Sequence, residues 1–236
     1  MDTPALAPGL PDRLAAIRAR IASATSRSGR PPEAVRLVAV SKTFDADAVR
    51  EAHAAGQLDF GENRVQEALA KRAALADLPL RWHLIGHLQT NKASKVPGAF
   101  ACVHSVDGED VLLRLSRAAD AGGHVLPILV QVDLASEATK SGAPESSLRT
   151  LLARAGELPG LQVEGLMLLP PFAEDPEDVR PWFRRLRALR DTLVAEGVPA
   201  AHLRELSMGM SHDFEVAIEE GATIVRVGSA IFGSRG

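Results

Sequence analysis

Short runs of apolar and β-branched residues alternate along this chain with segments in which hydrophobic residues recur every three or four positions. Runs of the first kind are typical of buried strands, and segments of the second kind are typical of helices with one buried face. We predict eight strands from the runs. They are expected near Arg36–Lys42, Asp59–Glu62, Arg81–Gly86, Ala101–Val106, Leu126–Asp133, Leu161–Leu169, Leu203–Met208 and Thr223–Gly228.

The helical spacing starts before the first predicted strand. Leu10, Leu14, Ile17 and Ile21 share one helical face, which predicts an extra N-terminal capping helix over residues 10–29. Between the strands the same spacing is clearest in two segments. Their apolar residues are Val111, Leu112, Leu115 and Ala118, and then Val179, Phe183, Leu186, Leu189 and Leu193.

Eight strand-then-helix units predict an α/β fold, a closed TIM-type (β/α)8 barrel, because right-handed crossovers place the helices outside the parallel strands. A doubly wound open sheet is the alternative. With 236 residues, 46% hydrophobic content and no linker or repeat, residues 1–236 are expected to form one domain. Helix starts are expected at Asp45 and Asp107, and helix ends at Gly56, Gly122 and Gly197.

Charge and composition narrow the class of partner. The chain carries 27 Lys and Arg against 30 Asp and Glu, a net charge of -3, which favours a small-molecule ligand over nucleic acid or an anionic membrane. No apolar stretch approaches the roughly 20 residues of a membrane helix. The single cysteine, Cys102, forms no internal disulfide, and residues 1–10 do not resemble a signal peptide, so a cytoplasmic protein is expected.

Lys42 is the first candidate for chemistry. It ends the apolar run that begins at Leu37, and the carboxyl ends of barrel strands are where such folds keep their active sites. Desolvation there favours the neutral amine that attacks an aldehyde to form a Schiff base. A lysine that only reaches solvent at a strand end is the alternative.

The last predicted strand leads into a glycine-serine turn that could bind a phosphate. Gly228 lets an anion approach the backbone, and phosphate sites after the last two strands recur in barrels. Ser207 and Ser211, after the preceding strand, could complete the site, although Ser211 could equally cap a helix. Arg226 faces inward if it shares a face with Gly228; its partner would be a ring nitrogen or, alternatively, a buried carboxylate.

Other residues that often carry chemistry are interpreted differently. His83 and His87 would lie about 13 Å apart in a strand, which argues against a metal site. Cys102 is expected in the core, and Lys140 is expected to be a solvated loop lysine that could reach the mouth of the barrel.

At these residues the sequence closely resembles the pyridoxal phosphate homeostasis proteins, the YggS/PROSC family, a single-barrel relative of the N-terminal domain of alanine racemase. The resemblance covers nearly the whole chain. The matching segments are Ala39–Thr43, Phe60–Glu67, Trp82–Lys92, Ser207–Ser211 and Val225–Gly233.

The resemblance implies pyridoxal 5′-phosphate (PLP) as cofactor, held as a Schiff base on Lys42. It further implies that Arg226 faces the pyridine nitrogen and that Asn63 lies beside the cofactor. The residues implied to bind phosphate are Ser207, Ser211, Gly228 and Ser229, where the family often has threonine in place of Ser229. His83 and Asn91 are similar to residues that line the mouth in the family, without an assigned contact.

The resemblance also bears on whether the protein is an enzyme. Racemases of this kind use a tyrosine from a second domain as their other base, and these 236 residues contain no tyrosine. We therefore expect a monomeric, non-catalytic PLP carrier that buffers the cofactor, delivers it to PLP-dependent apo-enzymes and influences amino-acid and keto-acid balance. The alternatives are a weak racemase, with His83 or His87 replacing the phenol, and a Schiff-base aldolase.

Overall fold

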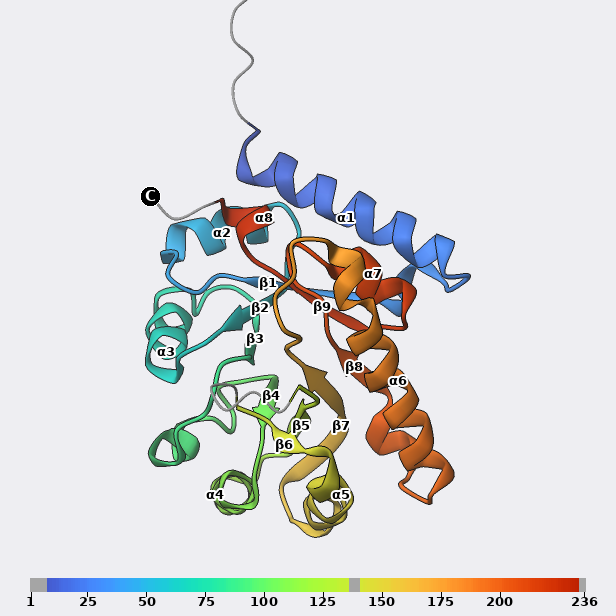
Figure 1. Ribbon diagram of the computed structural model, residues 1–236. Coiled ribbons are helices and arrows are strands. Elements are labelled where there is room, and N and C mark those ends of the chain that lie inside the picture. The colour runs from blue at the N-terminus through green and yellow to red at the C-terminus, as the bar shows by residue number, and fades with distance from the viewer. Residues whose placement is uncertain (1–7, 136–140, 234–236) are drawn as a thin grey trace, which may run out of the picture.

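The strands close into a parallel barrel in a computed structural model that describes residues 8–135 and 141–233 (Figure 1). The strand order is β4-β3-β2-β1-β9-β8-β7-β5-β6, and β4 also pairs with β5, which closes the ring and leaves β6 as a short extension of β5. The strands are β1 (Arg36–Val40), β2 (Asp59–Glu62), β3 (Arg81–Leu84), β4 (Cys102–Val106), β5 (Leu126–Asp133), β6 (Ala143–Pro144), β7 (Leu161–Leu168), β8 (Glu205–Ser207) and β9 (Ile224–Val227).

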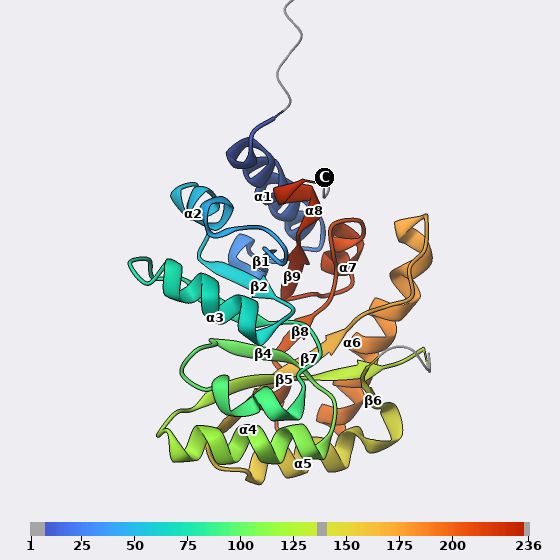
Figure 2. The same ribbon diagram turned by 90° about the vertical axis from the view of Figure 1, so that its left-hand side faces the viewer.

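Helices surround the barrel on its outside (Figure 2). They are α1 (Leu10–Arg27), α2 (Ala46–Ala54), α3 (Val65–Ala74), α4 (Glu109–Ala121), α5 (Leu148–Glu157), α6 (Arg180–Ala195), α7 (Phe214–Glu219) and α8 (Ser229–Phe232). None of the helices in the described part of the chain is long and apolar enough to cross a membrane.

The predicted closed barrel is confirmed, and the doubly wound alternative is wrong because the pairing of β4 with β5 closes the ring of strands. Asp59–Glu62 and Leu126–Asp133 form strands with the predicted bounds. Leu203 was expected in a strand and instead ends a 3-10 helix, Ala200–Leu203. β1 ends at Val40, so Lys42 lies in the loop beyond its strand rather than at the strand end.

The two predicted helix starts can be compared with the structure. The Asp45 carboxylate accepts the N–H of Ala48 at 2.9 Å, so the predicted cap of α2 is confirmed. The start of α4 was placed one residue early, because its N-cap is Gly108 rather than Asp107.

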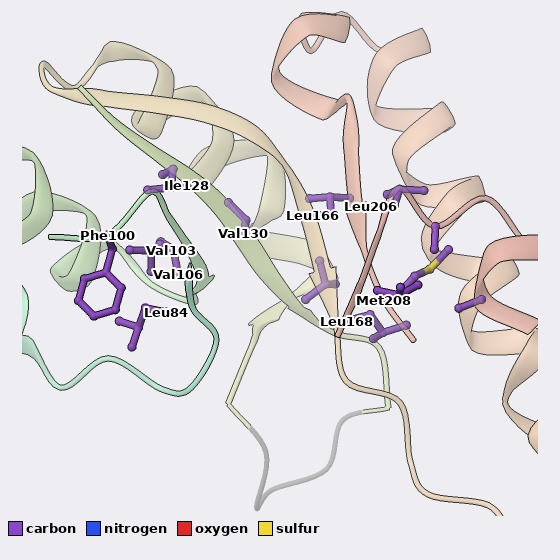
Figure 3. Close-up of a cluster of buried hydrophobic side chains, with 14 of the residues drawn as sticks. Leu84, Phe100, Val103, Val106, Ile128, Val130, Leu166, Leu168, Leu206 and Met208 are labelled. Carbon is purple, nitrogen blue, oxygen red and sulfur yellow. The ribbon is translucent and has the colours of Figure 1, made fainter. Parts of the chain in front are cut away.

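The barrel has two apolar layers because alternate residues of each strand face opposite sides. Leu166 and Leu168 on β7 face outward, toward the large cluster that packs between strands and helices (Figure 3). Met167, between them, belongs to a separate inner cluster. The other members of that inner cluster are Val38, Cys102, Leu129 and Ile224.

The N-terminal helix joins the beginning of the chain to its end. α1 packs against α2, α7 and α8, with Leu14 and Ile17 buried on the predicted face. Arg13 Nε donates to the Ile231 carbonyl of α8 at 2.7 Å. The predicted capping helix is therefore confirmed, and it supports the turn that follows the last strand.

Candidate functional site at the carboxyl ends of the strands

A cavity of about 970 Å³ opens at the carboxyl ends of the barrel strands. Its wall is made of residues that end a strand or follow one closely. They include Val40, Lys42, Asn63, Gly86, His87, Gln131, Ser141, Leu169–Ala173, Met210–Asp213, Arg226, Gly228 and Ser229. Of the seven site residues predicted from the sequence, the structure brings all but Ser207 to this one wall.

The backbone on both sides of Lys42 is anchored. Ser41 Oγ donates to Glu62 Oε1 at 2.6 Å, and the Thr43 N–H donates to Glu67 Oε1 at 2.6 Å. Thr43 has a φ of 71°, in the left-handed region that β-branched residues rarely adopt. Such strain persists only where surrounding contacts hold it, and here it sets the direction in which the chain leaves Lys42.

Lys71 connects the two anchors. Its ammonium donates to the Ser41 carbonyl at 2.7 Å, to Glu62 Oε1 at 2.7 Å and to Glu67 Oε1 at 3.0 Å, which uses its three N–H groups. The carboxylate of Glu62 is fully buried. Burial raises the pKa of Glu62, and hydrogen bonds from Lys71 and Ser41 counteract part of that rise. We define Ser41, Glu62, Glu67 and Lys71 as the clamp.

The turn after β9 provides backbone N–H groups that converge on one oxygen. Ser211 Oγ lies 3.1 Å from the Gly228 nitrogen and 3.5 Å from the Ala230 nitrogen. A Cβ added to Gly228 would stand 3.1 Å from the Val40 carbonyl oxygen, so a side chain there would crowd β1. The alternative role of Ser211 as a helix cap is wrong, because Asp213 is the N-cap residue of α7.

Arg226 faces inward with Ile224, as the sequence analysis required for its role. Its Nη1 donates to Ser207 Oγ at 2.6 Å and its Nη2 to the Leu168 carbonyl at 2.9 Å. Both acceptors are neutral oxygens. The alternative partner considered from the sequence, a buried carboxylate, is therefore not one of these two acceptors. Burial lowers the pKa of Arg226 to about 10, against the Coulombic attraction of Asp213.

Asn63 and His87 form the wall nearest β2 and β3. The backbone of Gly86 passes so close to Asn63 that an added Cβ would lie 2.4 Å from the Asn63 carbonyl oxygen. That close approach requires glycine and holds Asn63 at the cavity edge. His87 is exposed there, with Nδ1 3.2 Å from Asp107 Oδ2.

Four residues named in the sequence analysis lie away from the cavity wall or outside the described residues. His83 is buried in the barrel interior rather than at the mouth, since its side chain points down between Asp59 and His104. Asn91 is exposed in a 3-10 helix and lines a separate small pocket. Ser207 is fully buried and its hydroxyl contacts His104. Lys140 lies outside the described residues.

His83, Cys102 and His104 bring three atoms of metal-ligating type within 4.8 Å of one another. The two facing imidazole nitrogens are 3.0 Å apart and share a hydrogen bond. Burial raises the pKa of the Cys102 thiol, which disfavours the thiolate that binds metals. The arrangement fits a hydrogen-bonded pair beside a core cysteine, as expected for Cys102.

Asp59→Asn is expected to lower the free energy of unfolding by about 2 kcal/mol at pH 7. Burial opposes ionisation of Asp59, but hydrogen bonds from His83 and Arg81 outweigh it and lower its pKa from 3.8 to about 2. Because the folded pKa is the lower one, this stabilisation is complete above about pH 4 and disappears as the pH falls toward 2.

Urea unfolding of both proteins between pH 7 and pH 3 measures this effect. Asp120→Asn, at an exposed position on α4, is the surface control. A difference between wild type and Asp59→Asn that stays constant down to pH 3 would contradict the assignment.

The clamp and the buried acid Asp59 were not assigned roles from the sequence. Glu62 stands in a predicted strand at a position that proves fully buried, and an ionisable residue in an otherwise buried strand was the available signal. Its partner on α3 could not be identified without the fold.

This chain is similar in sequence to proteins that are already known. Residues 13–236 match the family described as alanine racemase, N-terminal domain. A protein of Aquifex aeolicus named pyridoxal phosphate homeostasis protein is 46% identical over 95% of this chain and 97% of its own length. One of the same name from Pseudomonas aeruginosa is 47% identical over 95% of each chain.

Solved structures agree with this likeness. The protein PipY of Synechococcus elongatus, solved with PLP bound, is 42% identical and has a TM-score of 0.84 over 95% of this chain and 100% of its own. An alanine racemase of Streptomyces coelicolor is 24% identical, with a TM-score of 0.69 over 94% of this chain and 59% of its own. The likeness to the racemase concerns the fold alone.

Proposed function

This chain belongs to the alanine racemase N-terminal domain family, together with the pyridoxal phosphate homeostasis proteins, and on that premise we propose that it binds PLP in the cavity at the carboxyl ends of its strands. The observation that carries the proposal is that an amine, Lys42, and the turn at Gly228 and Ser229 open onto the same cavity, where the N–H groups of Gly228 and Ala230 converge on Ser211 Oγ. An aldehyde that also carries a phosphate needs both features.

Different residues of the cavity wall bind different parts of the cofactor. Lys42 supplies the amine that joins the aldehyde as a Schiff base, with release of water. Ser211, Gly228 and Ser229 hold the phosphate. The hydroxyl oxygen of Ser211 already accepts hydrogen bonds from the backbone N–H groups of Gly228 and Ala230. Asn63 lies beside the ring.

Arg226 is assigned to the pyridine nitrogen. A guanidinium has five N–H donors and no acceptor, and two of those donors are used by Ser207 and Leu168. The remaining donors suit a ring nitrogen that stays unprotonated. Ser207 then supports Arg226 instead of binding phosphate, and Ser211, Gly228 and Ser229 keep the phosphate role expected from the sequence.

A carrier role in PLP homeostasis fits these residues better than efficient catalysis. When bound, the cofactor supplies an electrophilic aldehyde and a ring that can accept electrons, and an arginine at the ring nitrogen weakens that acceptor. We therefore propose a protein that stores PLP and releases it to PLP-dependent apo-enzymes, acting as a monomer in the cytoplasm.

A weak racemase is the second candidate, and the position of His87 on the cavity wall favours it over a version that uses the buried His83. Exchange of the α-proton of an amino acid in a single turnover would separate this candidate from a carrier. The cavity of a Schiff-base aldolase would also hold a lysine and a phosphate, but such a protein has no visible chromophore.

Visible absorption of the purified protein during titration with PLP is the experiment that tests the proposal. We expect a band typical of a protein-bound Schiff base, its disappearance on borohydride reduction, and a pyridoxyl group on the peptide that contains Lys42. A protein that stays colourless and binds no added PLP would overturn the proposal and favour the aldolase. A pyridoxyl group on another lysine would overturn the assignment of Lys42.

A further inference from the structure

A chain of hydrogen-bonded side chains crosses the barrel interior next to the cavity. Asp59 Oδ1 lies 2.9 Å from His83 Nε2, and His83 Nδ1 lies 3.0 Å from His104 Nε2. His104 Nδ1 lies 2.9 Å from Ser207 Oγ, which accepts from Arg226 Nη1 at 2.6 Å. Each of the five residues is at most 5% exposed. They come from β2, β3, β4, β8 and β9 in turn.

The carboxylate at one end sets the direction of this chain. With a pKa of about 2, Asp59 is ionised near neutral pH and only accepts hydrogen bonds, so His83 donates through Nε2. With both rings neutral, His83 Nδ1 then accepts from His104 Nε2, and His104 Nδ1 accepts from Ser207. Every hydrogen in this series of hydrogen bonds therefore points toward Asp59.

The opposite direction requires an extra proton on the imidazole pair. His83 would have to donate through both nitrogens, and His104 would then donate to Ser207. That proton would place a charge on the His83 ring, which is 2% exposed in the barrel interior, while burial, with smaller contributions from His83 and Arg226, lowers the pKa of His104 well below its ordinary value. A second positive charge beside the buried guanidinium of Arg226 is disfavoured for the same reason.

Ser207 connects this direction of hydrogen bonding to Arg226. Because the Ser207 hydrogen points to His104, the lone pairs of Ser207 Oγ remain to accept from Nη1 of Arg226. The Leu168 carbonyl holds Nη2 at 2.9 Å. Two acceptors therefore fix the plane of the guanidinium, and hydrogen bonds aligned in one direction strengthen one another.

We propose that Asp59, His83 and His104 are positioning residues for Arg226, because their one-directional hydrogen bonds keep Ser207 an acceptor and hold the guanidinium plane facing the cavity. None of the three lines the cavity. The inference rests on the proposed function, since Arg226 acts there on the ring nitrogen of PLP.

The first test uses the protein without cofactor. In ¹⁵N-histidine NMR spectra at neutral pH, His83 and His104 are expected as neutral rings protonated at Nε2. In Asp59→Asn the amide can donate or accept, so part of the His104 population is expected to move its proton to Nδ1. A wild-type His83 protonated at both nitrogens, or a His104 protonated at Nδ1, overturns the proposal.

The second test measures PLP affinity and the absorption maximum of the bound chromophore. His104→Leu removes the acceptor for the Ser207 hydrogen and is expected to weaken PLP binding by about tenfold and to shift the maximum. His104→Asn, which can again accept from Ser207, is expected to restore part of both. Cys102→Ala, a matched change in the same inner layer, is expected to leave both nearly unchanged.

The outcomes separate this inference from the proposed function. If the wild type binds no PLP, the proposed function fails, and the NMR measurement still decides the direction of the chain. If the wild type binds PLP and His104→Leu binds it equally well with the same absorption maximum, the positioning role is wrong while the proposed function stands. Thermal unfolding of each variant confirms that the comparison is between folded proteins.

Discussion

Lys42→Ala is expected to give a folded protein that forms no reducible PLP adduct and binds PLP at least about 100-fold more weakly, a loss of about 2.8 kcal/mol. The covalent bond depends on one amine, and Lys42 is the described lysine on the cavity wall. The turn at Gly228 and Ser229 and the side chain of Arg226 remain in place in this variant, so weak non-covalent binding is expected to persist. The measurement is a PLP titration followed by absorption and by mass mapping after borohydride reduction.

Lys95→Ala is the matched control for this prediction. Lys95 is exposed at the end of a 3-10 helix and is not on the cavity wall. It is expected to bind PLP as the wild type does. If Lys42→Ala retained a reducible adduct at wild-type yield, another lysine would be the site of attachment.

Lys71→Met is expected to lower the free energy of unfolding by roughly 3–5 kcal/mol, because it removes one partner of a buried ion pair. The change leaves the fully buried carboxylate of Glu62 with only the Ser41 hydroxyl as a described donor. It also removes the bond to the Ser41 carbonyl, so the backbone at Lys42 loses an anchor. Urea unfolding at pH 7 measures the stability, and PLP affinity should fall in the same variant.

A second substitution tests whether the lost stability comes from the unpaired charge. Glu62→Gln combined with Lys71→Met is expected to recover most of the loss, since no buried charge then lacks a partner. The control is Arg50→Met, which breaks the exposed ion pair with Asp77 and is expected to cause no measurable change. If the double variant were as unstable as Lys71→Met, the cost would lie in packing rather than in charge.

The periodicity of the sequence was enough to predict the barrel, and the errors have local causes. Strand ends shifted by one or two residues where the chain leaves the hydrogen-bonded ladder, as after Val40. Leu203 is buried without being in a strand, because it ends a 3-10 helix that leads into β8. β6 spans two residues, Ala143–Pro144, which is too short for any alternating pattern.

The site was predictable where strand order alone brings residues together. Lys42, Asn63, Arg226 and Gly228 each lie within two residues of a strand end or inside the last strand, and all reach one cavity. The roles of Ser207 and His83 instead depended on how far below the cavity each side chain lies in the barrel interior.

The distance of a side chain from the cavity and the identity of its hydrogen-bond partners are set by the tertiary structure. Whether an inward side chain opens to the cavity or turns to a neighbour across the barrel depends on contacts between strands distant in the chain, such as His104 with Ser207. The same holds for Lys71, whose three acceptors come from two strands' ends and its own helix.

The contact between α1 and α8 has a consequence for the order of synthesis. Arg13 and the Ile231 carbonyl are 218 positions apart, and β1 finds one of its two neighbours only in β9. A ribosome therefore completes the first helix long before α7 and α8 exist, and the part of its apolar face that they cover remains exposed until then. Ring closure must follow emergence of the final strand, and closure of such distant contacts is slow. The turn at Gly228 and Ser229 is made after every strand of the barrel, so a nascent chain gains the complete wall of the cavity only once β9 has emerged.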